Sequence, residues 1–350
     1  MAKDVNPPRG MRDFLPLEKL KREQVLARIR GTYRSHGFSE IETPALEDLA
    51  KLTSGQGGDN EKLAYRVMKR GAELDEALAQ LPRPIALVPT MGALHAGHAA
   101  LIAAARRTAA TVVVSIFVNP RQFGSAADAA QYPRTPAADQ ELAEAAGAHL
   151  LFAPDVDQIY PPGEPVATID PGPLATRLEG ASRPGHFVGV ATVVSRLFDL
   201  VHPDQAYFGA KDAQQVRVIE WMAAQRSDGI TIHRVATVRD ADGLALSSRN
   251  QKLSASGRVA AAKAIPVALS LIAEAYASGV TGVAMLRSLA ERVIAAEPSV
   301  ALDYLDFADS ASLVPLAEGA QISDATSGEA LVSLAAVVDG VRLIDAITLP

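Results

Sequence analysis

The stretch 85-IALVPTMGALHAGH-98 decides the fold of this chain. Ile85 to Val88 is a short apolar run typical of a buried strand, and the turn after it holds His95 and His98. Apolar residues resume after His98 with helical spacing, so the stretch predicts a strand, a tight turn and a helix in succession. In open α/β sheets, ligands bind where strands end and helices begin. We therefore expect a binding site at this turn.

Strand-like and helix-like segments alternate on both sides of this turn. Strands are predicted at 85–89, 111–119, 149–154, 205–209 and 230–238. Helices are predicted at 72–81, 98–109, 136–146, 187–201 and 212–226. Alternation at this spacing favours an α/β fold in which crossover helices connect parallel strands. The near-continuous apolar run at 112–118 is typical of a strand that is buried on both faces.

The pattern changes after Arg249. Ser254 can cap a long helix that runs to Ala277, and a second helix is predicted at 281–296. Strands follow near 303–307 and at 330–338 and 341–349, and the last two flank an Asp-Gly pair typical of a hairpin turn. We expect a small α+β domain to close the chain.

Composition limits the kinds of protein that this chain can be. It has 350 residues, 48% of them hydrophobic, with no cysteine and a net charge of −6. The missing cysteines exclude disulfides and thiolate chemistry, and the negative charge argues against a nucleic-acid partner. No uninterrupted apolar run reaches the ~20 residues that span a bilayer, and the first residues lack the apolar core of a secretory signal. We expect a cytoplasmic protein with no membrane partner.

Charge and lysine usage divide the chain near residue 71. Residues 1–71 carry 14 Lys+Arg and 10 Asp+Glu, whereas the remaining residues carry 20 and 30. Six of the nine lysines lie in the first segment, which also has helical apolar spacing at 17–37. We expect an appended segment at 1–71, a nucleotide-binding domain at 72–237 and a C-terminal domain at 238–350.

The turn at His95 and His98 suits a phosphate-bearing ligand. A helix that begins there presents backbone N–H groups and partial positive charge, which both favour anions. Gly92 and Gly97 allow close approach of the backbone, and imidazoles can donate hydrogen bonds to phosphate oxygens as negative charge develops. Two histidines without a further ligand do not make a zinc site, so we expect no metal bound directly by protein here.

Further short motifs follow the turn in a fixed order. They are NPRQFG at 119–124, YPRT at 132–135, LEG at 178–180, RPGHF at 183–187, FGAKD at 208–212, QQ at 214–215 and SSRN at 247–250. With the HxGH turn, this combination resembles the pantoate–β-alanine ligase (pantothenate synthetase) family along essentially all of residues 72–350. The wider superfamily of HxGH nucleotidyltransferases shares only the first motif. The resemblance implies a Rossmann-like parallel sheet, a smaller C-terminal α+β domain and a homodimer.

The resemblance also implies a reaction and the residues that carry it. The family condenses pantoate with β-alanine through a pantoyl adenylate, using ATP and the magnesium that ATP carries, and releases pyrophosphate and AMP. His98, His95, Lys211 and Arg249 are the implied catalytic residues, and Gln122 and Gln215 are implied to hold pantoate. The residues implied to bind ATP form a larger set: Met91, Gly92, Ala93, Leu94, His95, Ala96, Gly97, His98, Gly209, Ala210, Lys211, Asp212, Val238, Leu246, Ser247, Ser248 and Arg249.

The residue types also fit this chemistry when the family resemblance is set aside. A carboxylate nucleophile is already ionised at neutral pH, so the site needs hydrogen-bond donors and cations more than a base. Lys211 and Arg249 supply positive charge, and Ser247 and Ser248 supply hydroxyl groups. Lysine is rare after Gly71, with three against 17 arginines, so Lys211 departs from the local bias. Glutamine amides orient hydroxyls and carboxylates without adding charge.

Three departures from the family pattern leave room for other functions. Ala210 stands where the family commonly has Glu, Ala213 where an aromatic residue is usual, and Leu246 where Met is usual. From the two alanines beside Lys211 we expect a looser ATP pocket and reduced but measurable ligase activity. One alternative is a non-catalytic module with a decayed pocket. Another is an HxGH nucleotidyltransferase for a phosphorylated metabolite, which would need additional basic residues.

The sequence leaves two residues undecided: each can line the pocket or serve only in the protein core. Glu179 lies in the LEG motif, and His186 lies in the RPGHF motif. A buried histidine or carboxylate with satisfied hydrogen bonds is an ordinary core feature, so neither residue is assigned by its spacing.

The first segment resembles a different family. The stretches PPRGMRDFLP, YRSHGFSEIETPALEDL and GGDNEKL resemble the N-terminal end of histidyl-tRNA synthetase, in its class II motif 1 region. The resemblance stops after about 70 residues, before the parts that bind ATP, histidine and tRNA in that family. We expect no synthetase activity, and we expect residues 1–71 to be dispensable for the ligase.

Overall fold

The computed structural model describes residues 21, 24–25, 27–28, 32, 66–68 and 71–350. The chain divides into two units, Met1–Ala64 and Tyr65–Pro350. In the first unit, the described positions 21, 24–25, 27–28 and 32 are helical, and the rest of the helix predicted at 17–37 lies outside the described residues. The fold described below is that of the second unit.

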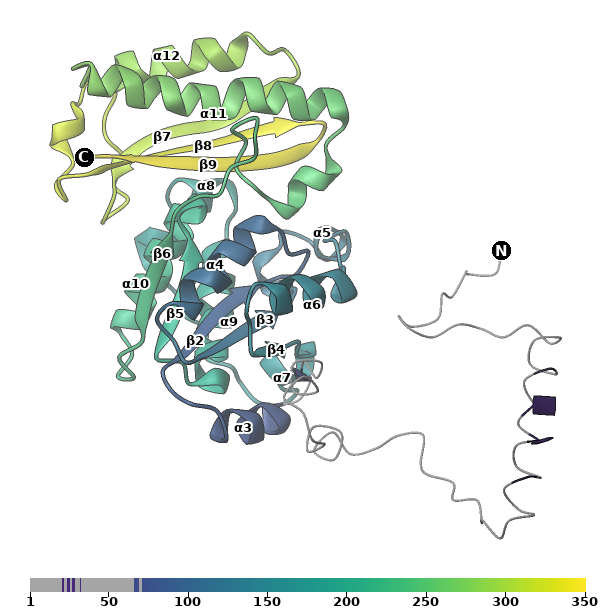
Figure 1. The fold of residues 1–350 in the computed structure, drawn as a ribbon. Coiled ribbons are helices and arrows are strands. Elements are labelled where there is room, and N and C mark those ends of the chain that lie inside the picture. The colour runs from purple at the N-terminus through teal and green to yellow at the C-terminus, as the bar shows by residue number, and fades with distance from the viewer. Residues whose placement is uncertain (1–20, 22–23, 26, 29–31, 33–65, 69–70) are drawn as a thin grey trace. The chain divides into compact units, whose positions relative to one another are not determined.

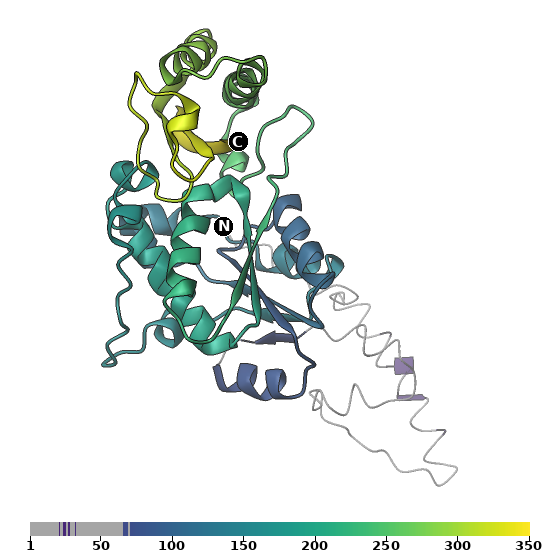
Figure 2. The ribbon, with the colours of Figure 1, turned by 90° about the vertical axis from the view of Figure 1, so that its left-hand side faces the viewer.

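Six parallel strands form the main sheet, in the order β1-β4-β3-β2-β5-β6 (Figures 1 and 2). The strands are β1 (Arg66–Met68), β2 (Ile85–Thr90), β3 (Thr111–Ile116), β4 (Leu150–Phe152), β5 (Gln205–Gly209) and β6 (Thr231–Val235). The chain moves outward from β2 through β3 to β4, then returns to the other side of β2 for β5 and β6. A change of direction of this kind opens a crevice at the carboxyl ends of the central strands.

Side chains of the central strands alternate between two apolar layers. Ile85 and Leu87 pack into one cluster, whereas Ala86 and Val88 pack into another, and all four are at most 2% exposed. The first cluster includes side chains of α3 (Gly71–Ala79), α9 (His186–Val201) and α10 (Ala213–Ala224). The second cluster includes side chains of α4 (Ala96–Arg106) and α6 (Pro136–Ala145). Burial on both faces explains why these strands are apolar without alternation.

A three-stranded antiparallel sheet makes up the C-terminal part. Its strands β7 (Val300–Asp309), β8 (Ala330–Val338) and β9 (Val341–Leu349) lie in sequence order. Helices α11 (Ala255–Ala277) and α12 (Val283–Ala295) cover one face and share one apolar core with the strands (Figure 1). The predicted hairpin turn is present, because Asp339 and Gly340 have φ values of 54° and 72°. Ser254 caps α11 as predicted, accepting a hydrogen bond from the Gly257 N–H at 3.0 Å.

Helix α11 begins after Ser254 and ends at Ala277, as the sequence predicted, and it is long and apolar. Among the described residues it is the one helix whose 23 residues and mean hydropathy of 1.5 would allow it to cross a membrane. Arg258, Lys263 and Glu274 interrupt its apolar residues, so the helix contains no continuous apolar run of the ~20 residues that span a bilayer. Its apolar side chains pack into the C-terminal core, where Ala261, Ala264 and other residues are fully buried, so it serves as a core helix.

The second face of the C-terminal sheet lies toward the parallel sheet. Leu331 of β8 and Ala346 of β9 share an apolar cluster with Leu178, which precedes helix α8. Figure 1 shows α8 beneath β7 to β9. The remaining short helices are α5 (Ala126–Ala130), α7 (Val156–Ile159), α8 (Glu179–Ser182) and the 3-10 helices η2 (Pro120–Gln122), η3 (Gly172–Ala175), η4 (Ala210–Asp212), η5 (Ser248–Lys252) and η6 (Ile322–Asp324).

The predicted fold class is confirmed, and one strand was not foreseen. Each predicted strand and helix of residues 72–350 has a counterpart, with ends shifted by up to three residues. Strand β1 was missed because Arg66–Met68 lies on the lysine-rich side of the break in composition. It pairs with β4, with Arg66 opposite Leu150, so the sheet begins before that break. The division at 237–238 remains a proposal.

We predict that Leu87→Ala destabilises the protein by about 2–5 kcal/mol, because it leaves a cavity in the fully buried layer beneath α9. Val267→Ala, on the exposed side of α11, is the matched control and should change stability by less than about 0.5 kcal/mol. Urea unfolding of both variants measures the difference. Equal midpoints for the two variants would contradict this account of the core.

Candidate active site

The turn after β2 is fixed by a buried carboxylate that comes from α6. Asp139 Oδ2 accepts the Ala93 N–H at 3.0 Å, and Oδ1 accepts the Leu94 N–H at 2.7 Å. Gly92 has a φ of +85°, and a Cβ at this position would lie 3.0 Å from Asp139, so glycine is required. Asp139 is 2% exposed and therefore sets the path of the turn from inside the protein.

His95 and His98 cap the helix that follows. His95 is the N-cap of α4, and its Nδ1 accepts the Gly97 N–H at 3.1 Å. His98 reaches back so that its own Nδ1 accepts the His95 N–H at 3.2 Å. A neutral imidazole that accepts at Nδ1 carries its proton on Nε2, so both rings are left with an Nε2–H donor. A Cβ at Gly97 would lie 2.9 Å from the His95 ring, which explains the glycine between the histidines.

These two imidazoles are uncharged at neutral pH. Burial, aided by the positive charge of Lys211, lowers the pKa of His95 to about 4. Burial also lowers the pKa of His98 to about 3, with His95 and Lys211 adding to the effect. The expectation that free backbone N–H groups would hold a phosphate needs correction, because the imidazoles and Asp139 already occupy several of them. The Nε2–H groups of the two histidines are side-chain donors that remain for a ligand.

Cationic and hydroxyl groups from later segments lie around the same space. Lys211 sits in η4, immediately after β5, and its charge acts on both histidines. Ser248 Oγ is hydrogen-bonded to Tyr132 Oη at 2.9 Å, and Ser247 Oγ accepts the Arg249 N–H at 3.3 Å. Segments that are more than a hundred residues apart thus meet at the carboxyl edge of the sheet.

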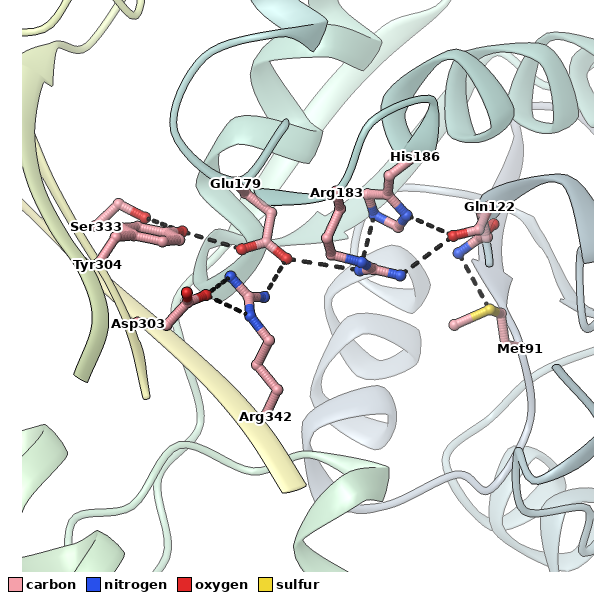
Figure 3. Close-up of polar contacts among 9 residues, drawn as sticks. All are labelled: Met91, Gln122, Glu179, Arg183, His186, Asp303, Tyr304, Ser333 and Arg342. Carbon is pink, nitrogen blue, oxygen red and sulfur yellow. Dashed lines mark hydrogen bonds and ion pairs between the residues drawn. The ribbon is translucent and has the colours of Figure 1, made fainter. Parts of the chain in front are cut away.

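A pair of buried amides lies at the end of β3. Gln122 is 8% exposed, and its Oε1 accepts a hydrogen bond from Asn119 Nδ2 at 3.0 Å. Its Nε2 points to the sulfur of Met91 at 3.2 Å (Figure 3). Asn119 is held in turn by the Gly189 carbonyl at 3.1 Å and by the Tyr160 hydroxyl at 2.8 Å. The Gln122 amide is therefore fixed, with a weak sulfur acceptor as its outward partner.

One cavity of about 240 Å³ gathers most of the predicted residues. The predicted residues that line it are Met91, His95, Gly97, His98, Gln122, Gly209, Lys211, Asp212, Gln215, Val238, Leu246, Ser247, Ser248 and Arg249. The predicted residues that do not line it are Gly92, Ala93, Leu94, Ala96 and Ala210. The backbone of Ala93 and Leu94 binds Asp139, so these residues shape the turn from behind.

Several lining residues were left open or missed by the sequence reasoning. Glu179 and His186, which stayed undecided, both line the cavity. Tyr132 and Arg183 also line it, and the only sequence signal for them was membership in the YPRT and RPGHF motifs. Asp139 had no signal, because a single acidic residue in the first turn of a helix is an ordinary surface feature.

Comparison with known proteins gives two family matches. The pantoate–β-alanine ligase model matches residues 66–348, and the histidyl-tRNA synthetase model matches residues 10–79. The first match includes strand β1, and the two matches overlap over residues 66–79.

Individual relatives cover most of the chain. The pantothenate synthetase of Corynebacterium glutamicum is 49% identical over 270 residues, covering 76% of this chain and 94% of the relative. That of Agrobacterium fabrum is 45% identical over 284 residues, covering 80% and 94%.

Solved structures give the same result. The Thermus thermophilus pantothenate synthetase has a TM-score of 0.73 and 42% identity, covering 81% of this chain and 98% of that one. The Francisella tularensis pantoate–β-alanine ligase, solved with β-γ ATP and β-alanine, has a TM-score of 0.65 and 31% identity, covering 81% and 97%. The chain, with its HxGH turn and its shared cavity, belongs to the pantoate–β-alanine ligase family.

Proposed function

We propose that this protein condenses pantoate with β-alanine, using ATP, in the cavity at the carboxyl edge of the parallel sheet. The observation that carries the proposal is that His98, Lys211, Arg249, Gln122 and Gln215 all line that one cavity. Neutral donors, cations and amides in one enclosed space fit a triphosphate together with a hydroxy acid. The ATP-bound relative from Francisella tularensis supports ATP as the nucleotide.

The first step forms a mixed anhydride. A carboxylate oxygen of pantoate forms a bond to the α-phosphorus of ATP while the bond from that phosphorus to the bridging oxygen breaks, so that pyrophosphate leaves. No proton has to be removed from the nucleophile, because a carboxylate is ionised at neutral pH. The protein therefore works by positioning the reactants and by stabilising charge.

The two histidines supply fixed donors for this step. Their Nε2–H groups can bind phosphate oxygens, and the helix cap at Nδ1 holds each ring in place. Donors that are oriented before the reaction stabilise developing charge without rearrangement. We assign this role to His98, with His95 beside it.

Lys211 and Arg249 counter the negative charge of the triphosphate. Lys211 acts from η4 and Arg249 from η5, so the two cations approach the cavity from different segments. Among the described residues, no group of three or more His, Asp or Glu side chains could hold a metal ion alone. The magnesium that ATP carries would therefore be held mainly by the nucleotide, near Asp212 in the cavity wall. It would supply charge neutralisation for the leaving pyrophosphate.

Gln122 and Gln215 fit the other substrate. Amide groups donate and accept hydrogen bonds without charge, so they can orient the hydroxyls and carboxylate of pantoate. In the second step the β-alanine nitrogen bonds to the carbonyl carbon, the bond to the phosphate oxygen breaks, and AMP leaves. The ammonium nitrogen of β-alanine loses two protons to solvent or buffer and keeps one, and pantothenate results.

The three departures from the family pattern do not stand equally close to the cavity. Ala213 and Leu246 line it, whereas Ala210 does not. The expectation of a looser nucleotide pocket therefore rests on Ala213, which also packs against the apolar cluster beneath the C-terminal sheet.

The family resemblance further supports a homodimer located in the cytoplasm. Sedimentation of the purified chain at micromolar concentration tests the dimer.

We predict that His98→Gln lowers the rate of pantoate-dependent pyrophosphate release by about 10²-fold, because it removes a preorganised donor. Glutamine at the third helical position can still reach the N-cap N–H, so the variant preserves the helix start. His149→Ala is the matched control, because His149 lies outside the cavity. Equal rates for His98→Gln and the unmodified chain would contradict the assignment.

We predict that the pH dependence of pyrophosphate release shows no step near pH 6.5. The lowered pKa values of about 4 and about 3 keep both histidines neutral until the pH falls well below 6.5. The rate should stay flat between pH ~5.5 and 8 with magnesium in excess, since an unshifted histidine would titrate near 6.5. A loss of activity at pH ~6.5 that His95→Gln or His98→Gln abolishes would contradict this.

We predict that removal of residues 1–64 leaves the pantoate-dependent rate and the melting temperature unchanged. Removal of residues 1–70 should lower the melting temperature, because it also deletes β1 and exposes the edge of β4. Thermal unfolding and pyrophosphate release of both truncations measure this. Inactivity or insolubility of the shorter deletion would show that the first segment is required.

A further inference from the structure

A continuous set of polar contacts joins the C-terminal sheet to Gln122. We name it the Glu179 bridge, and Figure 3 shows its course from β7–β9 to η2. Its members are Glu179, Arg183 and His186 on the side of the parallel sheet, and Asp303, Tyr304, Ser333 and Arg342 on the side of the C-terminal sheet.

Glu179 is the centre of the bridge, and its side chain is 6% exposed. Oε1 accepts a hydrogen bond from Arg342 Nη1 at 2.6 Å, and Oε2 accepts one from the Tyr304 hydroxyl at 3.1 Å. Arg183 lies 3.6 Å from the same carboxylate, and Arg342 also pairs with Asp303 at 2.7 Å. Two carboxylates thus balance two guanidinium groups, so no buried charge is left uncompensated.

The other end of the bridge holds the peptide group of Gln122. Its carbonyl oxygen accepts hydrogen bonds from His186 Nδ1 at 2.8 Å and from Arg183 Nη2 at 3.2 Å. A carbonyl cannot donate, so the His186 proton is on Nδ1, and Nε2 is free to accept from Arg183 Nη1 at 3.4 Å. Burial, aided by the positive charge of Arg183, lowers the pKa of His186 to about 4, so its imidazole is neutral.

The position of this peptide decides where the Gln122 amide points. Asn119 fixes Oε1, and Nε2 faces the Met91 sulfur, a weak acceptor that a substrate oxygen can replace. A shift of the Gln122 carbonyl would therefore move the donor that we assign to pantoate. Misplacement of a binding group by about 1 Å is enough to weaken its contact with a ligand substantially.

We propose that Glu179 is a positioning residue for pantoate. The C-terminal sheet docks on Glu179 through Arg342 and Tyr304, and this contact holds Arg183 in place. Arg183 and His186 then fix the position of Gln122. The inference rests on the proposed function, because it takes Gln122 as a pantoate ligand. It implies that pantoate binding and docking of the C-terminal sheet favour each other, since coupling between two sites is reciprocal.

Glu179→Gln tests the proposal with little change of shape. We expect the KM and the calorimetric Kd for pantoate to rise about tenfold, with the KM for ATP within about twofold, because typical couplings between sites are of this size. Arg342→Gln breaks the same pair from the C-terminal side and should give a similar rise. The pantoate Kd of the double variant should be close to that of either single variant, because both substitutions remove the same ion pair.

Two further variants separate positioning from simple stabilisation. Glu318→Gln removes a carboxylate of the C-terminal part that is 65% exposed and pairs with Arg287, and it should leave pantoate binding unchanged. Tyr304→Phe removes the hydroxyl that contacts Glu179 and Ser333 but leaves the Arg342 pair, so it should raise the pantoate Kd by less than Glu179→Gln does and keep the fold.

The outcomes distinguish this inference from the function on which it rests. Unchanged pantoate affinity in Glu179→Gln and Tyr304→Phe, with a lower melting temperature, would assign the bridge to stability alone and overturn the inference. An equal rise in the KM for ATP would also overturn it, because the effect would then not be specific to the pantoate side. Absence of pantoate binding by the unmodified chain would overturn the proposed function as well.

Discussion

The cap at the start of α4 is the contact on which the rest of the site depends. His95 and His98 each use Nδ1 to accept a backbone N–H, so the helix itself fixes the place and the tautomer of both rings. Burial near Lys211 keeps them uncharged. One local arrangement therefore yields a helix start and two oriented donors. Asp139 supports it by holding the preceding turn through two further N–H groups.

Parallel strands explain how groups distant in sequence reach those donors. Carboxyl ends of neighbouring parallel strands lie at one edge, so the segments that follow β2, β3, β5 and β6 all meet there. The C-terminal sheet then closes over this edge and contributes Tyr304, Ser333 and Asp345 to the cavity. Partial exclusion of water strengthens each hydrogen bond and charge contact inside. The Glu179 bridge is the polar part of that closure, and the cluster around Leu178 is its apolar part.

Most of the fold could be predicted because its signals are local. Apolar runs such as that of β3, and helical spacing such as that of α9, are each contained within one element. The elements that were missed are short or depend on their partners. Strand β1 has only three residues, and they lie in the segment whose composition differs from the rest of the chain. Helix α8 has four residues, which are too few to show helical periodicity.

By itself the sequence determined the α/β fold, the strand-turn-helix at His95 and the set of motifs that identify the family. The fold and the strand-turn-helix follow from patterns among neighbouring residues, and the family follows from motifs that occur in a fixed order. Only the tertiary structure decided the contacts of Asp139, His186 and Glu179, since the partner of each lies far away in sequence. Asp139 binds a turn 46 residues distant, His186 a carbonyl 64 residues distant, and Glu179 an arginine 163 residues distant. No periodicity or spacing encodes such contacts, because they exist only once the sheets have packed together.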